Sequence, residues 1–398
     1  MNTVLQGIRV LDLSTIVAGP TASMILSDLG AEVTKVERIG GGEDGRAMGP
    51  HRGEWGAYFV ALNRGKRSIT IDLSKPEGRD VILRLASSSD VFLENFRGGK
   101  AAALGLDEAA VRARKPDIIY ASLSAYGPGG PDYTKPGYDA VLQARTGIMS
   151  VTGTGAGHAM RTGVSILDMT TGTWVALGIL AALLERQRSG QGQRVDASLF
   201  QTGIAFMAYH LVYRQFTGRD LEPQGARHKA FAPYGSLPTA DGQIMIGISA
   251  DAQFRRLCNA LGHPEWSTDP RFRTNPDRVA NVDELENLIG SVLRTQPAAH
   301  WVKLLDEADI ANDALQSASQ VLDDPQAAAL DLFREIALSG EQSILLPRLP
   351  IALSRTPPAS QGPPPSTGQH SRAILHESGF SDAEIDALLK SGAVGTSA

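Results

Sequence analysis

Residues 161–172 have the clearest potential for chemistry, because one carboxylate, Asp168, stands there between two apolar runs. The run before it, 164–167, predicts a short strand, and the run after it, 173–184, predicts a helix. Asp at the start of a helix has an ordinary explanation, since Asp is a favoured N-cap and suits the positive end of the helix dipole. The rest of the chain must therefore decide whether Asp168 does more than cap a helix.

Several charged or glycine-rich turns follow other predicted strands. Arg38 closes the second strand, where dinucleotide folds bind a ribose or its phosphate, but the first turn lacks G-x-G-x-x-G, which argues against a nicotinamide cofactor. The glycine-rich residues 40–45 form either a ligand loop or simply a mobile one. The basic turn 63–67 suits a phosphate or solvent. Residues 95–97 follow a strand at the sheet edge where open α/β sheets bind ligands.

The elements that must position these residues alternate as strand and helix, which predicts an α/β fold with a parallel sheet. A long loop, 126–139, is rich in Gly, Pro and Tyr and carries Lys135 and Tyr138. Pro20 suits the first position of its helix. We expect strands at 8–13, 31–37, 68–73, 90–96, 118–124 and 193–198, and helices at 21–29, 58–63, 76–87, 173–184 and 199–216.

A second, smaller domain follows the polar residues 217–229. It should contain a hairpin of 232–238 and 243–248, with Asp-Gly at the turn, and three helices. The 398 residues suit two domains. We expect 1–216 to form the first part of the large domain, 217–325 the small α+β domain, and 326–398 a segment that returns to the large domain.

Composition excludes several classes of partner. A net charge of −5 without a long basic run argues against nucleic acid and anionic membranes. The most apolar segment, 174–184, is too short to cross a bilayer. A lone cysteine, Cys258, and no signal-peptide pattern suit a cytoplasmic protein, and the scattered histidines suggest no metal site.

A series of motifs extends along the whole chain. Among them are Val-Leu-Asp-Leu at 10–13, Leu-Gly-Ala-Glu-Val at 29–33, Glu-Asn-Phe at 94–96, Gly-Tyr-Asp at 137–139, Gly-Gln-Gly at 190–192 and Gly-Phe-Ser-Asp-Ala-Glu-Ile at 379–385. In order and spacing the chain resembles the class III CoA-transferases, the family of formyl-CoA transferase and L-carnitine CoA-transferase. The resemblance implies a Rossmann-like large domain, a small domain and two chains interlocked as a homodimer.

The resemblance also implies the roles of residues. Asp168 would be the catalytic nucleophile, passing through an aspartyl anhydride and an aspartyl-CoA thioester, with coenzyme A as substrate and neither metal nor nicotinamide. The CoA site would comprise Val17, Ala18, Arg38, Ile71, Asp72, Leu73, Ser74, Asn95, Phe96, Arg97, Lys135 and Tyr138. The acyl pocket would comprise Arg46 and Tyr58, covered by a loop of Ser249, Ala250 and Asp251.

Two departures from the family pattern bear on the substrate. Val17 replaces the glutamine of formyl-CoA transferase, and residues 248–251 replace its glycine-rich lid, so oxalate is not the expected acceptor. The same family contains α-methylacyl-CoA racemases, which pair the aspartate with a histidine where this chain has Tyr138. Tyrosine, with a pKa of about 10, is a poor proton shuttle at neutral pH, which favours a transferase. A non-catalytic CoA- or nucleotide-binding protein is the alternative of another class.

Four arginines lie near these motifs, namely Arg46, Arg97, Arg145 and Arg161. Each could contact CoA phosphates or solvent. A second carboxylate on the substrate would also need such a cation, because an unpaired buried charge is costly. We therefore expect a small dicarboxylate such as succinate, presented as succinyl-CoA, as one substrate.

Overall fold

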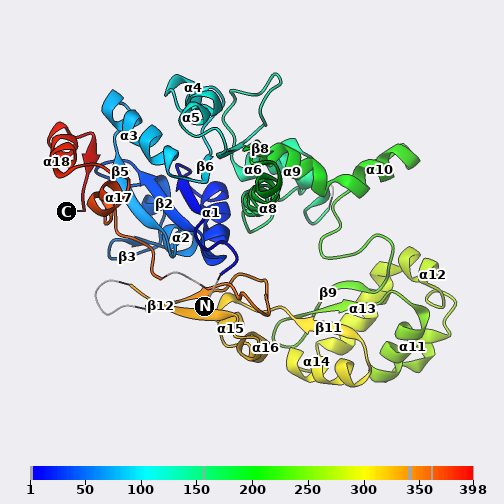
Figure 1. Ribbon diagram of the computed structural model, residues 1–398. Coiled ribbons are helices and arrows are strands. Elements are labelled where there is room, and N and C mark those ends of the chain that lie inside the picture. Colours follow the sequence, from blue (N-terminus) through cyan, green and yellow to red (C-terminus); the bar gives the residue numbers. More distant parts are fainter. Residues whose placement is uncertain (1–2, 156, 339–342, 360–361, 398) are drawn as a thin grey trace. The chain divides into compact units, whose positions relative to one another are not determined.

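The computed structural model describes residues 3–155, 157–338, 343–359 and 362–397 (Figure 1). The chain divides into two compact units, one of residues 1–148, 162–216 and 331–398 and the other of 149–161 and 217–330. Residues 149–161 therefore belong with the second unit, not with the range 1–216 in which we placed them. One contact that joins residues 149–161 to this unit is the hydrogen bond that the Gly225 N–H donates to the Gly153 carbonyl at 2.7 Å.

The first unit contains a seven-stranded sheet with the order β14-β5-β2-β1-β6-β7-β8. Its strands are β1 (Arg9–Asp12), β2 (Glu32–Glu37), β5 (Arg67–Ile71), β6 (Val91–Glu94), β7 (Ile119–Ser124), β8 (Arg194–Ser198) and β14 (Val394–Gly395). All pairs are parallel except β14 with β5. The predicted α/β class with a parallel sheet is confirmed. The strand order reverses between β1 and β6, which is where open α/β sheets bind ligands.

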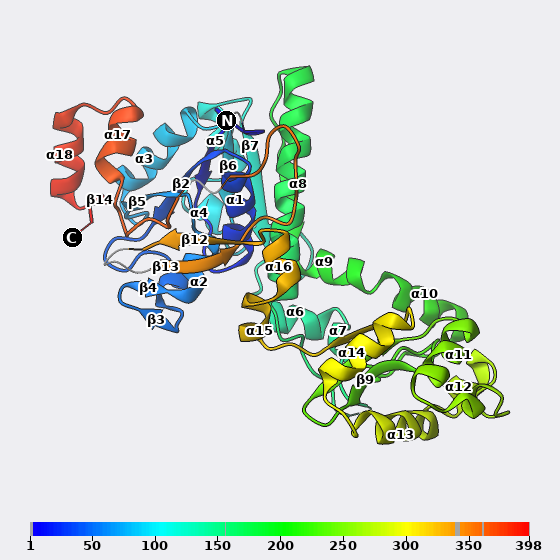
Figure 2. The ribbon, with the colours of Figure 1, turned by 90° about the horizontal axis from the view of Figure 1, so that it is seen from below.

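Helices cover both faces of this sheet (Figure 2). Neighbouring residues of a strand point to opposite faces, so Val10 packs with α1 (Ala18–Asp28) and α8 (Ile166–Ser189), whereas Leu11 packs with the opposite layer. That opposite layer comprises α3 (Pro76–Ser87), α5 (Glu108–Arg114), α17 (Ser371–Glu377) and α18 (Asp382–Ser391).

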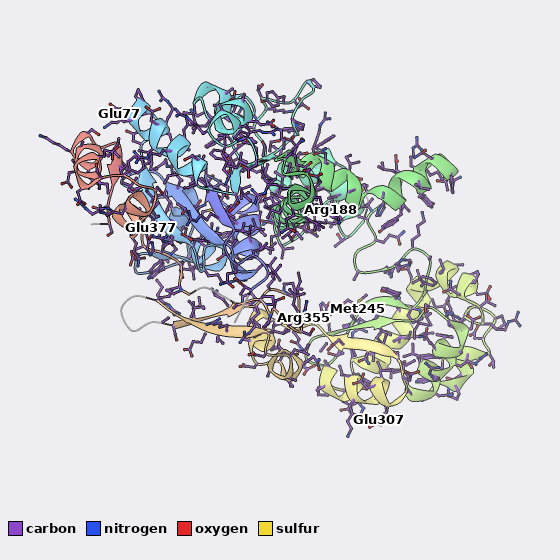
Figure 3. The ribbon with its side chains drawn as sticks, viewed as in Figure 1. Glu77, Arg188, Met245, Glu307, Arg355 and Glu377 are labelled. Carbon is purple, nitrogen blue, oxygen red and sulfur yellow. The ribbon has the colours of Figure 1, made fainter. Side chains whose placement is uncertain are left out.

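The C-terminal segment is tied to the first unit by β14 and by α17. The carboxylate of Glu377, labelled in Figure 3, pairs with Arg67 at 2.5 Å. The first unit also contains η1 (Asp44–Ala47), β3 (His51–Arg52), β4 (Trp55–Gly56), α2 (Ala57–Leu62), α4 (Lys100–Ala103), α6 (Asp139–Arg145), α9 (Leu199–Phe206), α10 (Ala208–Thr217), β12 (Phe333–Ala337) and β13 (Ser343–Pro347), and α7 (Ile148–Val151) leads into the second.

The second unit is built on a three-stranded antiparallel sheet with the order β11-β10-β9. The predicted hairpin is confirmed, and Cys258 is buried in the unit's core. The elements are β9 (Tyr234–Pro238), β10 (Gln243–Gly247), α11 (Asp251–Ala260), η2 (Pro264–Ser267), α12 (Asn275–Ala280), α13 (Val282–Leu293), α14 (Ala298–Glu307), β11 (Ala311–Ala314), α15 (Ala318–Leu322) and α16 (Pro325–Ala329).

One predicted element is wrong, and two others differ in their bounds. Residues 164–167 do not form a strand, because Ile166 and Leu167 already belong to α8; a short apolar run cannot distinguish a strand from a buried helical turn. The first helix begins at Ala18, so Pro20 is its third residue and not its first. The predicted helix 199–216 is two helices, α9 and α10, separated at Met207.

Helix α8 also corrects the expectation that the most apolar segment is too short for a bilayer. It spans 24 residues and is apolar enough to cross a membrane by length and composition. This is weak evidence for a span, since the core helix of a globular protein has the same properties. Residues Val175, Ile179 and Leu183 of α8 are buried in the core of the first unit.

Candidate active site

Asp168 is the third residue of α8 and is partly buried. It is therefore not the N-cap, which is Ser165, and Ser165 makes no side-chain capping bond. The bonds that a cap would supply come from another helix. One carboxylate oxygen of Asp139, in α6, accepts the N–H groups of Leu167 at 2.8 Å and of Asp168 at 3.1 Å. The Asp168 side chain therefore takes no part in capping its own helix.

Asp168 lines a cavity of about 250 Å³ in the first unit, at the carboxyl ends of β1, β6 and β7. The cavity thus lies at the point where the strand order reverses. Eight of the predicted site residues line it, namely Val17, Ala18, Asn95, Phe96, Arg97, Lys135, Tyr138 and Asp168. Thr15, Ile16, Tyr133 and Gly137 also line it, and sequence reasoning did not assign them to the site.

The close packing of α8 against α1 brings Asp168 to the cavity wall. Gly172 lies one helical turn after Asp168, on the same side of α8. A Cβ atom at Gly172 would lie 2.4 Å from the Ala18 carbonyl oxygen and 2.8 Å from Cβ of Thr21. Only glycine allows this approach, which sets the first turns of α1 and α8 beside each other.

The cavity wall formed by residues 15–18 is held in an unusual backbone conformation. Ile16 has a φ of 73°, which is disfavoured for a β-branched residue and costs roughly 1–3 kcal/mol. The Ile16 N–H donates to the Glu43 carboxylate at 2.8 Å. Thr15 exchanges two hydrogen bonds of 2.9 Å with the Asn95 amide. These bonds hold the turn in one arrangement.

Glu43 lies in the glycine-rich stretch 40–45, which we expected to approach a ligand or to be merely mobile. Its side chain is instead buried and bonded to the cavity wall. The only signal in the sequence was an acidic residue among glycines, and such a residue is usually exposed.

A buried ionic network around Asp12 lies next to the same wall of the cavity. Asp12 accepts from the Ser23 hydroxyl at 2.6 Å and lies 3.4 Å from the Lys66 amine and 3.6 Å from the Lys35 amine. Lys35 also donates to the Ser14 carbonyl. Burial alone would raise the pKa of Asp12, but the two lysines and hydrogen bonds lower it to about 2. Burial in turn lowers the pKa of Lys66 to about 7.

The basic turn 63–67 is neither a phosphate site nor a solvated turn. Arg64 pairs with the buried Asp28 at 2.6 Å, Lys66 belongs to the network around Asp12, and Arg67 pairs with Glu377. Carboxylates of this chain therefore pair with all three cations, and of these carboxylates Asp28 and Asp12 are buried whereas Glu377 is exposed.

Arg46 is likewise not available to a substrate carboxylate, which corrects its assignment to the acyl pocket. Its guanidinium donates to Glu37 at 2.6 and 2.8 Å and to the Pro365 carbonyl at 2.8 Å. It also lies 3.5 Å from the centroid of the Phe59 ring.

The other predicted residues lie outside the cavity. Arg38 is exposed and pairs with Asp44, and Tyr58 is exposed on α2. Residues 71–74 lie at the carboxyl end of β5, two strands away from β1 along the same sheet edge. Arg145 pairs with Asp132 at 3.3 Å.

Arg161 and the residues Ser249, Ala250 and Asp251 belong to the second unit. Asp251 begins α11 and pairs with the buried Arg278 at 2.8 Å.

Asp168 is the ionisable group of the cavity whose pKa is most clearly displaced. Burial raises the pKa of Asp168 to about 7, and the negative charge of Asp139 adds to the shift. A carboxylate in this state is more basic than usual and still ionised in part at neutral pH. The arrangement can therefore supply a nucleophile or a proton acceptor in a cavity that two cations, Arg97 and Lys135, also line. Within the described residues, no group of three or more His, Cys, Asp or Glu side chains could hold a metal ion.

Comparison with known proteins identifies the family. The model of CoA-transferase family III matches residues 5–371. The chain is 38% identical over 399 residues to an acyl-CoA transferase of Fusarium pseudograminearum, covering 97% of this chain and 87% of that protein. It is 37% identical over 382 residues to the succinate–glutarate CoA-transferase of Agrobacterium fabrum, covering 94% and 95% respectively.

A solved structure, that of a CaiB/BaiF family protein from Brucella suis, is similar with a TM-score of 0.88 and 34% identity, covering 95% of this chain and 100% of that one. The chain belongs to CoA-transferase family III and is a CoA-transferase. The family resemblance inferred from the motifs is confirmed.

Proposed function

We propose that this enzyme moves CoA from an acyl-CoA to a free carboxylic acid, with Asp168 as the covalent nucleophile. The observation that carries the proposal is the position of Asp168, a partly buried carboxylate in the wall of a cavity at the sheet's switch point that the cations Arg97 and Lys135 also line. CoA would lie over this edge, where a positive side chain can hold a phosphate. The residues Val17, Ala18 and Asn95 to Arg97 would bind it.

The reaction would proceed by exchange at acyl carbons. An Asp168 oxygen attacks the thioester carbonyl, the C–S bond breaks, and thiolate leaves with the electron pair. Thiolate then attacks the Asp168 acyl carbon of the anhydride and releases the donor acid. The acceptor carboxylate attacks the resulting aspartyl thioester and expels thiolate, so that a second anhydride forms. Thiolate then attacks the acceptor acyl carbon of this anhydride, and the Asp168 carboxylate leaves. Asp168 is regenerated as a carboxylate, and no net proton is consumed.

Asp168→Ala should abolish transfer while the protein still binds CoA. We expect a loss in kcat of roughly a thousandfold or more, since an essential nucleophile is removed. With succinyl-CoA alone, the intact mass of the wild type should increase by CoA less one water, and hydroxylamine should convert Asp168 to a hydroxamate. The control is Asp196→Asn, on β8 and outside the cavity. Substantial transfer by the alanine variant, or an adduct on another residue, would rule out the nucleophile.

We also propose that one substrate is a small dicarboxylate carried as succinyl-CoA. Two observations support it: the cations Arg97 and Lys135 in the cavity wall, and the name of the Agrobacterium fabrum relative, succinate–glutarate CoA-transferase. Purified enzyme given a panel of CoA donors and acids, scored by new thioester mass, should prefer succinyl-CoA. If monocarboxylyl-CoA donors exceed it by more than tenfold in kcat/KM, about 1.4 kcal/mol, the dicarboxylate proposal fails.

We propose in addition that two chains associate, interlocked as in the family that the sequence resembles. The support within this chain is a series of large apolar side chains left exposed on α8, α9 and α10. They are Met169, Trp174, Leu177, Leu184, Ile204, Phe206, Tyr209, Leu211, Val212 and Phe216. No residue of α10 is buried. Exposed apolar surface on this scale is typical of a protein interface.

A further inference from the structure

The first turn of α8 is unusual in being capped by a side chain of another helix. The first N–H groups of any helix lack partners within it and are commonly satisfied by the N-cap side chain. Here Asp139 takes that role for Leu167 and Asp168, from 28 and 29 positions earlier in the chain. The backbone that carries the proposed nucleophile is thus bonded directly to a carboxylate of α6.

Asp139 is itself held firmly. It is 6% exposed, and its second oxygen accepts from the side-chain amide of Gln143, one turn later on α6. The fully buried Gln143 bonds Thr162 twice, accepting from its N–H at 2.9 Å and donating to its hydroxyl at 3.1 Å. Asp139 therefore links α6 to the first turn of α8, and Gln143 links the same helix to Thr162, just before α8. A side chain with this many partners keeps one orientation.

The charges near this pair leave Asp139 as the principal electrostatic influence on Asp168. Arg97 donates to the Thr134 carbonyl, Lys135 lies 4.0 Å from Asp132, and Arg145 of α6 pairs with Asp132 as well. Tyr133 and Tyr138, the other titratable groups here, line the cavity. Within the described residues, Asp139 is the charged group that adds to burial in raising the pKa of Asp168.

We propose that Asp139 is the positioning residue of Asp168: by accepting both N–H groups, it orients the first turn of α8 so that the Asp168 carboxylate faces the cavity. The inference rests on the proposed role of Asp168 as the nucleophile. The arrangement also has a chemical consequence, because a like charge beside Asp168 makes that carboxylate more basic and therefore a stronger nucleophile once it is ionised.

The test is the pH dependence of kcat/KM for Asp139→Asn. Asparagine can still accept the two N–H groups but lacks the charge, so the acid limb of the profile should shift to lower pH. The asparagine amide nitrogen would then face the Gln143 amide nitrogen, a second donor, so positioning should be less exact and the plateau should fall by roughly tenfold or more. The matched control is Asp107→Asn, because Asp107 caps α5 through the Ala110 N–H at 3.0 Å and lies outside the cavity. It should leave the profile unchanged.

A second variant keeps the test informative if Asp139→Asn does not fold. Gln143→Leu frees the orientation of Asp139 but retains its charge, so kcat/KM should fall while the acid limb does not move to lower pH. An Asp139→Asn profile that coincides with the wild type in both limb and plateau would overturn the proposal, as would a Gln143→Leu enzyme of full activity. If Asp168→Ala retains transfer, the proposed function itself fails; if only the Asp139 result is negative, this inference alone fails.

Discussion

At the scale of single residues, the chemistry depends on the surroundings that set the pKa of one carboxylate, that of Asp168. Asp168 lies where burial and the neighbouring Asp139 both disfavour ionisation and raise its pKa to about 7. Asp12 has a buried environment too, yet two lysines and two hydroxyls bring its pKa down to about 2. The same side chain is therefore structural in one position and chemically reactive in the other, and the difference lies in the partners.

The raised pKa of Asp168 predicts that Asp168→Asn stabilises the protein at alkaline pH. The pKa is about 7 in the folded state and about 3.8 in the unfolded state, so between these values the native protein binds more protons. Stability contributed by the protonated group is therefore lost as pH rises through that window. The asparagine variant has no such loss, so its Tm should exceed that of the wild type at pH 8, and the gain should vanish near pH 4.

Asp196→Asn provides the control for this measurement, since Asp196 is paired with Arg194 at 2.7 Å and lies outside the cavity. It should not raise Tm at pH 8. A wild type as stable as Asp168→Asn at that pH would show that ionised Asp168 costs the fold nothing.

At the scale of elements, the site depends on the contact between α1 and α8. α1 begins at Ala18, in the cavity wall, and α8 begins two residues before Asp168. Both helices also belong to the same layer over the sheet. Gly172 allows their first turns to meet, because its missing side chain leaves room for the Ala18 carbonyl. The distance between Asp168 and the residues 17–18 is therefore a property of helix packing.

Gly172→Ala should accordingly damage both stability and catalysis. The added methyl would lie 2.4 Å from the Ala18 carbonyl oxygen, so the helices must separate. We expect a loss of about 1–3 kcal/mol in unfolding free energy and of roughly tenfold or more in kcat/KM. Denaturant unfolding and steady-state kinetics would measure both.

Gly178→Ala, six residues later in α8, serves as the control. Its Cβ would meet the Val195 side chain at 2.6 Å and not the cavity wall, so stability should fall with little change in kcat/KM. If Gly172→Ala loses no more activity than Gly178→Ala, the close approach has no role in the site.

At the scale of the whole molecule, the sheet order assembles the site from segments that are remote in sequence. The cavity receives residues after β1, β6 and β7 together with the start of α8. The apolar side chains of α8 to α10 remain exposed in the single chain, and Phe216 is 86% accessible. Exposure of that kind is costly for a protein that remains a monomer.

We therefore predict that the enzyme is a dimer in solution. Light scattering at micromolar concentration should give about twice the chain mass of 42.3 kDa. Phe216→Asp should weaken the association, since a charge would enter an apolar contact. The matched exposed position Leu330→Asp, in the second unit, should not. A wild type that scatters as a monomer at this concentration would contradict the prediction.

The sequence alone was sufficient for the local elements and for the family. Strands β2 and β7 and helix α3 match their predicted positions closely, because apolar periodicity and the turn residues at their ends are encoded within each segment. Motif order along the chain was sufficient to choose a CoA-transferase and to single out Asp168. Where patterns were short, as at residues 164–167, the same reasoning failed.

Only the tertiary structure showed which side chains meet. The sequence does not distinguish Arg46 from Arg97 as a candidate cation. In the structure, however, Arg46 is paired with Glu37, whereas Arg97 lines the cavity. Glu43 and Asp139 carry no local sign that they hold the cavity wall and the first turn of α8. The physical reason is that a charged side chain takes its role from its partners, and these come from segments 27 and 29 residues away whose meeting depends on strand order and helix packing.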